Sequence, residues 1–272
     1  METATRYVHD GREPVRTSTY AKGVAQLREA GQERPFTFRE NIMARVEAYE
    51  RGDKTLFNTW LDSCTGIVTK SESTLFQLVS PSPELIHTPS GFNDSFLPID
   101  YDAVQGIVLD SSKGKYNQLL ENRDILIHGG WLAAVEKDKA LLKVYRDIMF
   151  KGFKRDKAMG FYVRQNTEED ELRALFVHDL NNYSNANGDG NLIYDGSFLR
   201  GSPVVVSAAG AREKKPGSAY RNQAMTEEER LDERVRAILS PYEQLKCSGT
   251  VKLYDNITEN AVRELKGLYK QK

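Results

Sequence analysis

Side chains that carry oxygen alternate along one segment rich in Asn and Gly. Asn185, Asn187 and Asp189 occupy alternate positions, and Gly190 follows them. A hard cation such as Ca²⁺ needs several oxygens that converge on one point, and a glycine permits the sharp turn that brings them together. This spacing, with a further carboxylate nearby, makes four residues candidate metal ligands: Asn185, Asn187, Asp189 and Asp195.

The segment NANGDGNLIYDG resembles the calcium loop of EF-hand and dockerin-type motifs. Those families place a bidentate carboxylate at the twelfth position, where this chain has Gly196, with Asp195 one residue earlier. The flanking residues also favour strands, whereas an EF-hand has flanking helices. A hairpin turn in which Asp189 and Gly190 use positive φ accounts for the same residues without a metal. We therefore expect a metal-free turn and no cofactor.

A second group of carboxylates lies in the aromatic stretch NDSFLPIDYD. Paired acids hold Mg²⁺ or carry out acid/base chemistry, and His178 follows a predicted strand beside the Asn-rich segment. The same acids also suit exposed positions or helix caps. The candidate catalytic residues of the chain are Asp94, Asp100, Asp102 and His178.

The familiar catalytic and metal-binding motifs are absent from the sequence. Its four histidines never occur at the spacing of zinc ligands, and Cys64 and Cys247 lie too far apart in sequence to form a cluster. The segment SSKGKYNQ does not follow the order of a phosphate-binding loop. The sequence therefore identifies no reaction, and Cys64 is interpreted as a core thiol.

Composition indicates a globular protein that stays in the cytoplasm. Hydrophobic residues make up 39% of the 272 residues, the formal charge is -1, and the N-terminus lacks an apolar stretch. We expect a soluble intracellular chain that does not cross a membrane. The near-zero charge disfavours nucleic acid as a partner, although basic clusters such as KGFKRDK keep that alternative open.

Several elements can be predicted from local patterns. Thr37 and Glu40 have the spacing of a capping box at the start of a helix, and Trp131–Phe150 forms an amphipathic pattern that predicts one long helix. Leu75–Val79 favours a strand, whereas Trp60 is expected to anchor the core within a short helix.

The second half of the chain favours strands, because apolar residues there recur with a period of two. GFYVRQ and ELRALFVHDL predict a hairpin within a sheet of at least four strands. The fold class is α+β, with a largely antiparallel sheet in the second half covered by helices from both halves. In one compact body we expect a flexible N-terminal arm (1–20), a mainly helical lobe with a long aromatic loop (21–157), and an antiparallel sheet lobe with C-terminal helices (158–272).

These observations favour a non-enzymatic binding or assembly protein. The sheet and the aromatic loop supply surfaces, while no catalytic set is visible, so we expect a protein partner or self-association. Two alternatives stay open: a metal-dependent hydrolase or transferase that uses the loop carboxylates, and an accessory protein that binds nucleic acid.

Overall fold

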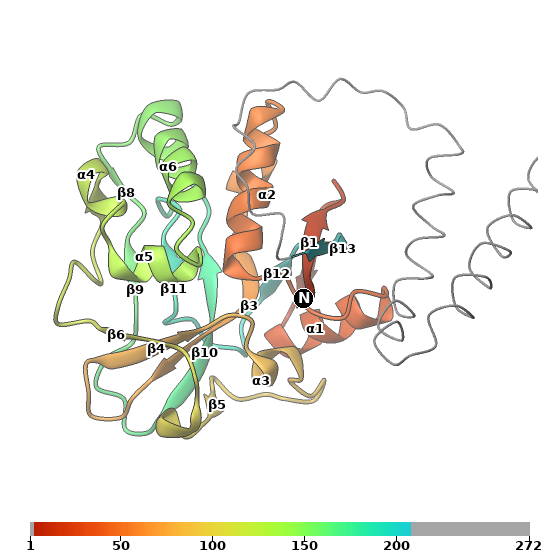
Figure 1. The fold of residues 1–272 in the computed structure, drawn as a ribbon. Coiled ribbons are helices and arrows are strands. Elements are labelled where there is room, and N and C mark those ends of the chain that lie inside the picture. The colour runs from red at the N-terminus through yellow and green to blue at the C-terminus, as the bar shows by residue number, and fades with distance from the viewer. Residues whose placement is uncertain (1–2, 208–272) are drawn as a thin grey trace, which may run out of the picture. The chain divides into compact units, whose positions relative to one another are not determined.

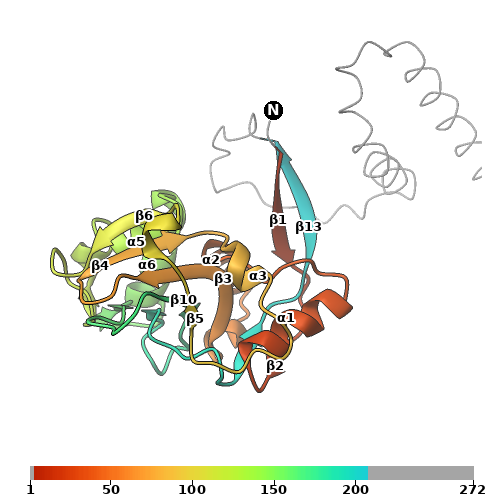
Figure 2. The same cartoon turned by 90° about the horizontal axis from the view of Figure 1, so that it is seen from below.

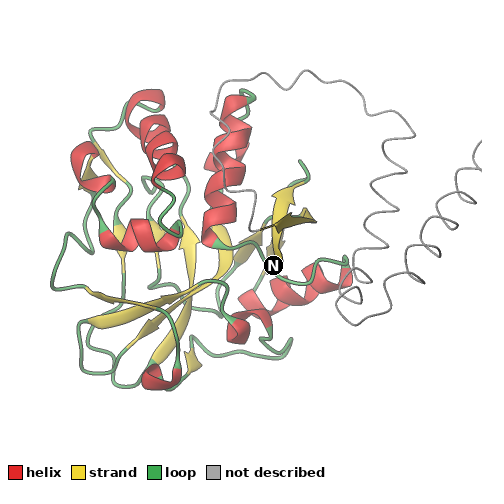
Figure 3. Ribbon diagram, viewed as in Figure 1, coloured by secondary structure: helices red, strands yellow, loops and turns green. Residues whose placement is uncertain are grey.

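The computed structural model of the protein describes residues 3–207, which combine helices with a curled, mixed sheet (Figures 1 and 3). The chain is therefore an α+β protein, as its sequence predicts. None of the helices in this range combines the length and the apolar composition that crossing a bilayer requires. The C-terminal helices expected after residue 207 lie outside the described residues.

The elements follow one another in the order shown in Figure 1. The strands are β1 (Thr3–His9), β2 (Val15–Thr17), β3 (Leu61–Thr69), β4 (Leu75–Val79), β5 (Leu97–Pro98), β6 (Ile107–Asp110), β7 (Leu120–Glu121), β8 (Lys157–Ala158), β9 (Phe161–Tyr162), β10 (Glu171–Val177), β11 (Ala186–Asn187), β12 (Gly196–Phe198) and β13 (Gly201–Ser207). The helices are α1 (Tyr20–Glu29), α2 (Phe38–Glu50), α3 (Pro83–Ile86), α4 (Asn122–Ile125), α5 (Gly129–Ala134) and α6 (Lys139–Asp147), with short 3₁₀ turns η1 (Thr55–Phe57) and η2 (Tyr101–Ala103) and a π-helical turn η3 (Ile148–Gly152).

The main sheet has the strand order β6-β4-β3-β10-β11-β9, and β5 also pairs with β10. Its pairs are antiparallel except for β9 with β11. The sheet draws β3, β4, β5 and β6 from the first half of the chain, whereas the sequence predicts a sheet in the second half. Almost every residue of β3 is buried, so this strand lacks the alternation that reveals a half-exposed strand. The expected hairpin is also wrong, because β11 separates β9 from β10.

The N-terminal residues form strands and not the flexible arm expected for residues 1–20. β1 lies beside β13 (Figure 2) and pairs with it along its whole length, from Thr3 opposite Ser207 to His9 opposite Gly201. β2 pairs with β12. The partner strands lie nearly the whole described length of the chain away. Local periodicity therefore carries no signal for this pairing, because the hydrogen bonds that define it are non-local.

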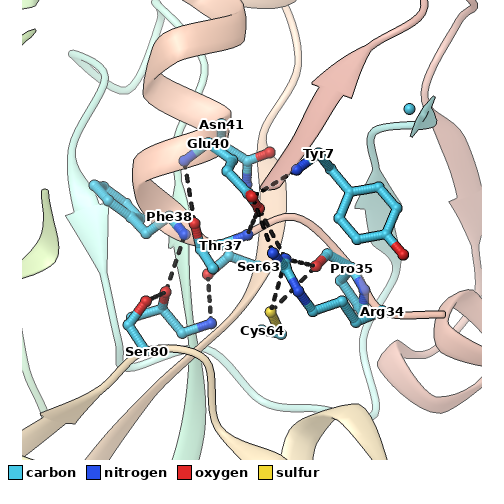
Figure 4. Close-up of polar contacts among 12 residues, drawn as sticks. Tyr7, Arg34, Pro35, Thr37, Phe38, Glu40, Asn41, Ser63, Cys64 and Ser80 are labelled. Carbon is cyan, nitrogen blue, oxygen red and sulfur yellow. Dashed lines mark hydrogen bonds and ion pairs between the residues drawn. The ribbon is translucent and has the colours of Figure 1, made fainter. Parts of the chain in front are cut away.

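The capping box at the start of α2 is confirmed. Thr37 Oγ1 accepts the Glu40 N–H at 3.2 Å, and Glu40 Oε2 accepts the Thr37 N–H at 2.7 Å (Figure 4). The same carboxylate forms a bidentate ion pair with Arg34 at 2.8 and 2.9 Å and accepts the backbone N–H of Tyr7 at 2.8 Å. Glu40 thus ties β1 and the segment before α2 to the helix.

Cys64 lies in β3 beneath this network, also drawn in Figure 4. Its thiol is fully buried and donates to the Pro35 carbonyl at 3.1 Å. Burial raises the pKa of the Cys64 thiol to about 12, which keeps it protonated at neutral pH. These surroundings agree with the interpretation of Cys64 as a core thiol.

The helix expected over Trp131–Phe150 is divided into α5, α6 and the π-helical turn η3. The break lies at Glu136 and Lys137, both of which have positive φ, and Asp138 then caps α6 by accepting the Leu141 N–H at 2.9 Å. The break leaves the backbone N–H groups at the start of α6 without helical acceptors. The Asp138 carboxylate accepts one of them and so acts as the N-cap.

Within residues 3–207, two hydrophobic cores lie on opposite faces of the sheet. On one face Ile67 and Leu175 pack with the side chains of α2, α5 and α6, among them Trp131. On the other face Val68 and Leu172 pack with α1, α3 and Phe198. Each of these strands therefore contributes side chains to both cores, because the pleat of a strand directs successive side chains to opposite faces of the sheet.

Candidate functional site

A cavity of about 450 Å³ opens on the α1 face of the sheet, where β3 begins and β10 ends. Its volume falls within the range of small-molecule sites. We call it the aromatic pocket, and it is lined by Tyr20, Trp60, Asp62, Ala174, Phe176, His178, Gly190, Asn191, Leu192, Ile193, Tyr194 and Asp195.

The pairing of β3 with β10 places the floor of the pocket. Phe176 is directly opposite Asp62 in the antiparallel register. Trp60 lies two positions before Asp62, and His178 lies two positions after Phe176. Because the pairing is antiparallel, the pleat directs all four side chains to one face of the sheet. The expectation that Trp60 anchors the core is wrong: its side chain is 37% exposed at this end of the sheet.

The first residue of α1 forms a second wall. The Tyr20 N–H donates to the Leu192 carbonyl at 2.9 Å, and its hydroxyl donates to the Ser63 carbonyl at 3.0 Å. Its ring meets that of Phe198 edge to face, with centroids 5.2 Å apart. Tyr20 is therefore held at both ends and is a rigid part of the pocket.

Residues 190–195 form the third wall, and a buried arginine holds them in place. Arg173 Nη1 donates to the Gly190 carbonyl at 3.1 Å, to Asn191 Oδ1 at 2.6 Å and to the Ser95 carbonyl at 3.3 Å. Its Nε pairs with Glu171 at 2.8 Å. Because both members of this ion pair are buried, the acceptors on the wall complete the hydrogen bonding of a guanidinium that has left water.

Arg45 anchors the earlier part of the Asn-rich segment. This fully buried guanidinium donates to Ser184 Oγ at 2.7 Å, to the Tyr145 hydroxyl at 2.9 Å and to the Thr59 carbonyl at 2.7 Å. It thereby connects α2, α6 and the residue before Trp60. The two buried arginines hold this part of the chain at Ser184 and at Gly190 with Asn191.

Close packing, and not positive φ, explains the glycines of this segment. Gly188 and Gly190 both lack a left-handed backbone. A Cβ at Gly190 would lie 2.4 Å from Phe176 Cε1, and one at Gly188 would lie 2.1 Å from Ile67 Cδ1. The hairpin-turn interpretation is corrected in this respect: the glycines let the backbone lie against side chains of β3 and β10.

Asp62 is the charged group at the floor of the pocket. Its Oδ2 accepts the Ser197 N–H at 2.8 Å, and within residues 3–207 no Lys or Arg forms an ion pair with it. Burial raises the pKa of Asp62 to about 7, against the smaller opposing effect of the Ser197 hydrogen bond. A carboxyl with this pKa is partly ionised at neutral pH and responds strongly to a charge placed beside it.

His178 is a neutral neighbour of Asp62. Asn187 Oδ1 accepts the Asp189 N–H at 2.7 Å, which turns Asn187 Nδ2 toward His178 Nε2 at 3.1 Å. An amide NH₂ only donates, so Nε2 must accept and the imidazole carries its proton on Nδ1. Burial also lowers the pKa of His178, which favours this neutral form.

The four candidate metal ligands have separate roles in the structure. Asn185 Oδ1 accepts the Gly160 N–H at 2.8 Å, and Asn187 Oδ1 accepts that of Asp189. Asp189 lies 4.0 Å from Arg164, whereas Asp195 is at the rim of the aromatic pocket. No group of three or more His, Cys, Asp or Glu side chains in the described range is arranged to hold a metal. The expectation that this segment is free of metal stays a prediction.

The candidate catalytic residues are also dispersed, and only His178 lines the aromatic pocket. Asp94 is exposed, Asp100 caps η2 by accepting the Asp102 N–H at 3.0 Å, and Asp102 forms an exposed ion pair with Lys70 at 3.0 Å. Caps and exposed acids were the alternative interpretation of these residues.

Trp60, Asp62 and Phe176 line one pocket that the sequence pattern does not predict. The alternation of Trp60 with Asp62, and of Phe176 with His178, was the available signal. It indicates that each pair shares a face of a strand, but the register that joins the two strands is set by tertiary pairing.

Comparison with known proteins identifies a fold and no family. No family model matches the sequence, and no curated protein matches it. The chain is similar to a solved structure described as "Accommodation of massive sequence variation in Nanoarchaeota by the C-type lectin fold", with a TM-score of 0.55 and 17% sequence identity. The match covers 71% of this chain and 99% of the other. At this identity the likeness shows a C-type lectin-like fold alone.

Proposed function

We propose that this chain is a non-enzymatic binding protein that takes its ligand in the aromatic pocket. The observation that carries the proposal is the pocket itself: a preformed cavity with several aromatic walls and one carboxyl at its floor. Such apolar concavities with few polar groups are the usual form of ligand sites. The rigid strands β3 and β10 supply the floor, so ligand binding requires little ordering of the chain.

The structural neighbour supports this proposal. That protein is described as accommodating massive sequence variation on the C-type lectin fold. A fold that tolerates many different side chains over one frame suits a binding surface, where the frame stays constant and the lining determines the ligand.

The arrangement of polar groups favours binding over catalysis. Asp62 is hydrogen-bonded to Ser197, while His178 is hydrogen-bonded to Asn187. Neither contact joins a nucleophile to a base, which is the arrangement that covalent catalysis needs. Three predictions from the sequence gain no supporting contact from the described residues. They are a hydrolase or transferase, a nucleic-acid-binding protein, and a protein partner or self-association.

A fragment screen with a pocket variant tests the proposal. Trp60 is 37% exposed and Tyr194 is 64% exposed, and the double substitution Trp60→Ala with Tyr194→Ala removes two aromatic rings from the pocket lining. Ligand-observed NMR of the full chain should find small aromatic-binding fragments whose signals are lost in the double variant.

The control is Ile127→Ala, which removes an apolar side chain that is 77% exposed and lies outside the pocket. This variant should keep every fragment that the wild type binds. The absence of saturable fragments, or equal binding by the wild type and the double variant, would overturn the proposed site.

A further inference from the structure

The charged groups of the aromatic pocket all have the same sign. Its lining contains the carboxyls of Asp62 and Asp195, and no Lys or Arg. His178 is held neutral by its hydrogen bond to Asn187 and by burial. An anionic ligand would therefore meet only like charge in this cavity, whereas a cation would find a carboxyl without an ionic partner.

The aromatic rings of the pocket are also available to a cation. Lys and Arg side chains do lie over rings elsewhere in the described range, for example Arg173 over Phe96 at 5.2 Å and Lys70 over Tyr101 at 5.0 Å. No such contact within residues 3–207 uses Trp60, Phe176 or Tyr194. Recognition of alkylated ammonium groups uses several ring faces around one cation, with tryptophan the strongest of them.

We propose, on the basis of the proposed function, that the pocket binds an organic cation whose ammonium group lies beside the Asp62 carboxylate. Its alkyl substituents would contact Trp60, Phe176 and Tyr194. The carboxylate supplies charge complementarity and the rings supply both contact area and cation–π attraction, so the two parts of the site select the same chemistry.

Proton linkage gives this proposal a distinct signature. A bound cation favours ionised Asp62, whose pKa in the free protein is raised to about 7. Affinity should therefore rise by about tenfold between pH 6 and pH 8 as the carboxyl loses its proton. The other titratable groups that face the cavity are Asp195, Tyr20, Tyr194 and His178; His178 would gain charge only at lower pH and would then weaken cation binding further.

The test compares a cation with its uncharged isostere on the wild-type chain. Choline and 3,3-dimethylbutan-1-ol have the same shape and differ by the exchange of nitrogen for carbon. We expect choline to bind at least about tenfold more tightly, measured by calorimetry and by the fluorescence of Trp60 in a Trp131→Phe background. Benzyltrimethylammonium provides a larger probe for the same comparison.

Asp62→Asn should reduce the preference for choline and abolish its pH dependence, while Asp94→Asn, at an exposed carboxylate outside the pocket, should preserve both. Equal binding of choline and its isostere would overturn the cation proposal and leave the binding function intact. If only neutral molecules, such as simple sugars, bind in the pocket, the cation proposal is likewise overturned and the binding function is kept. Failure of fragments of every charge to bind would overturn the binding function as well. The calorimetric comparison of choline with its isostere uses the wild-type chain and does not depend on the folding of any variant.

Discussion

At the scale of single residues, Asp62 sets both the chemistry of the pocket and a cost to stability. Its neighbours leave it with a hydrogen bond from Ser197 and no basic partner in the described range. A buried carboxyl without a basic partner destabilises the folded state when it is ionised. Such destabilising groups are typical of functional sites, where a ligand requires them.

Replacement of Asp62 by Asn should remove a pH dependence of stability. The pKa of Asp62 is raised to about 7 in the folded chain, above its unfolded value, so the folded state retains the proton longer. Wild-type stability should therefore fall as pH rises from about 4 to 7 and then level off, by about 4 kcal/mol in total. Asp62→Asn should lack this fall, as measured by urea unfolding at pH 5 and pH 8.

The control for this experiment is Asp195→Asn, because Asp195 is exposed at the rim of the same pocket. That variant should follow the wild-type profile. A wild-type chain whose stability relative to Asp62→Asn stays constant between the two pH values would contradict the assignment of a raised pKa.

At the scale of elements, the pocket depends on how its third wall is held to β10. Residues 190–195 have little regular structure of their own, and Arg173 supplies hydrogen bonds that a longer strand would otherwise provide. Arg173 donates hydrogen bonds to Gly190 and Asn191 of this wall but does not line the cavity, so it is a positioning residue.

Arg173→Lys should loosen this wall while keeping the positive charge beside Glu171. A lysine cannot reproduce the planar fork that reaches Gly190, Asn191 and Ser95, so we expect a loss of about 2 kcal/mol of stability. Hydrogen–deuterium exchange should increase in residues 190–195, and choline affinity should fall.

Arg164→Lys is the matched control. The exposed Arg164 side chain lies 4.0 Å from Asp189, the residue just before this wall. It should change neither exchange nor affinity. Unchanged exchange of residues 190–195 in Arg173→Lys would show that other contacts hold the wall.

At the scale of the whole molecule, stability depends on two cores separated by the sheet, and the pocket lies at the end of one of them. Leu142 of α6 is fully buried in the core on the opposite face. Leu142→Asp should cost about 3–5 kcal/mol of unfolding free energy, because it places an unpaired charge in that core.

The adjacent Lys143→Asp supplies a control, since Lys143 is exposed on the same helix. Thermal melting should be lowered strongly by the first substitution and only slightly by the second. Equal melting temperatures in the two variants would contradict the packing of α6.

The sequence alone determined features that depend on near neighbours. The capping box of Thr37 with Glu40, the strand Leu75–Val79 and the buried face of Leu142 arise from residues close together in the chain. Capping and periodic burial act over a few residues, so their pattern is visible in the sequence.

Only the tertiary structure decided the pairing of β1 with β13 and the assembly of the aromatic pocket. Asp62 is opposite Phe176, more than a hundred residues away, through a register that no local pattern contains. Tyr20 and Tyr194 join them because α1 and the Asn-rich segment pack on the same face. Strand register and the approach of distant segments depend on burial throughout the fold. For this reason the sequence does not show that residues 190–195 of the Asn-rich segment form a wall of the pocket.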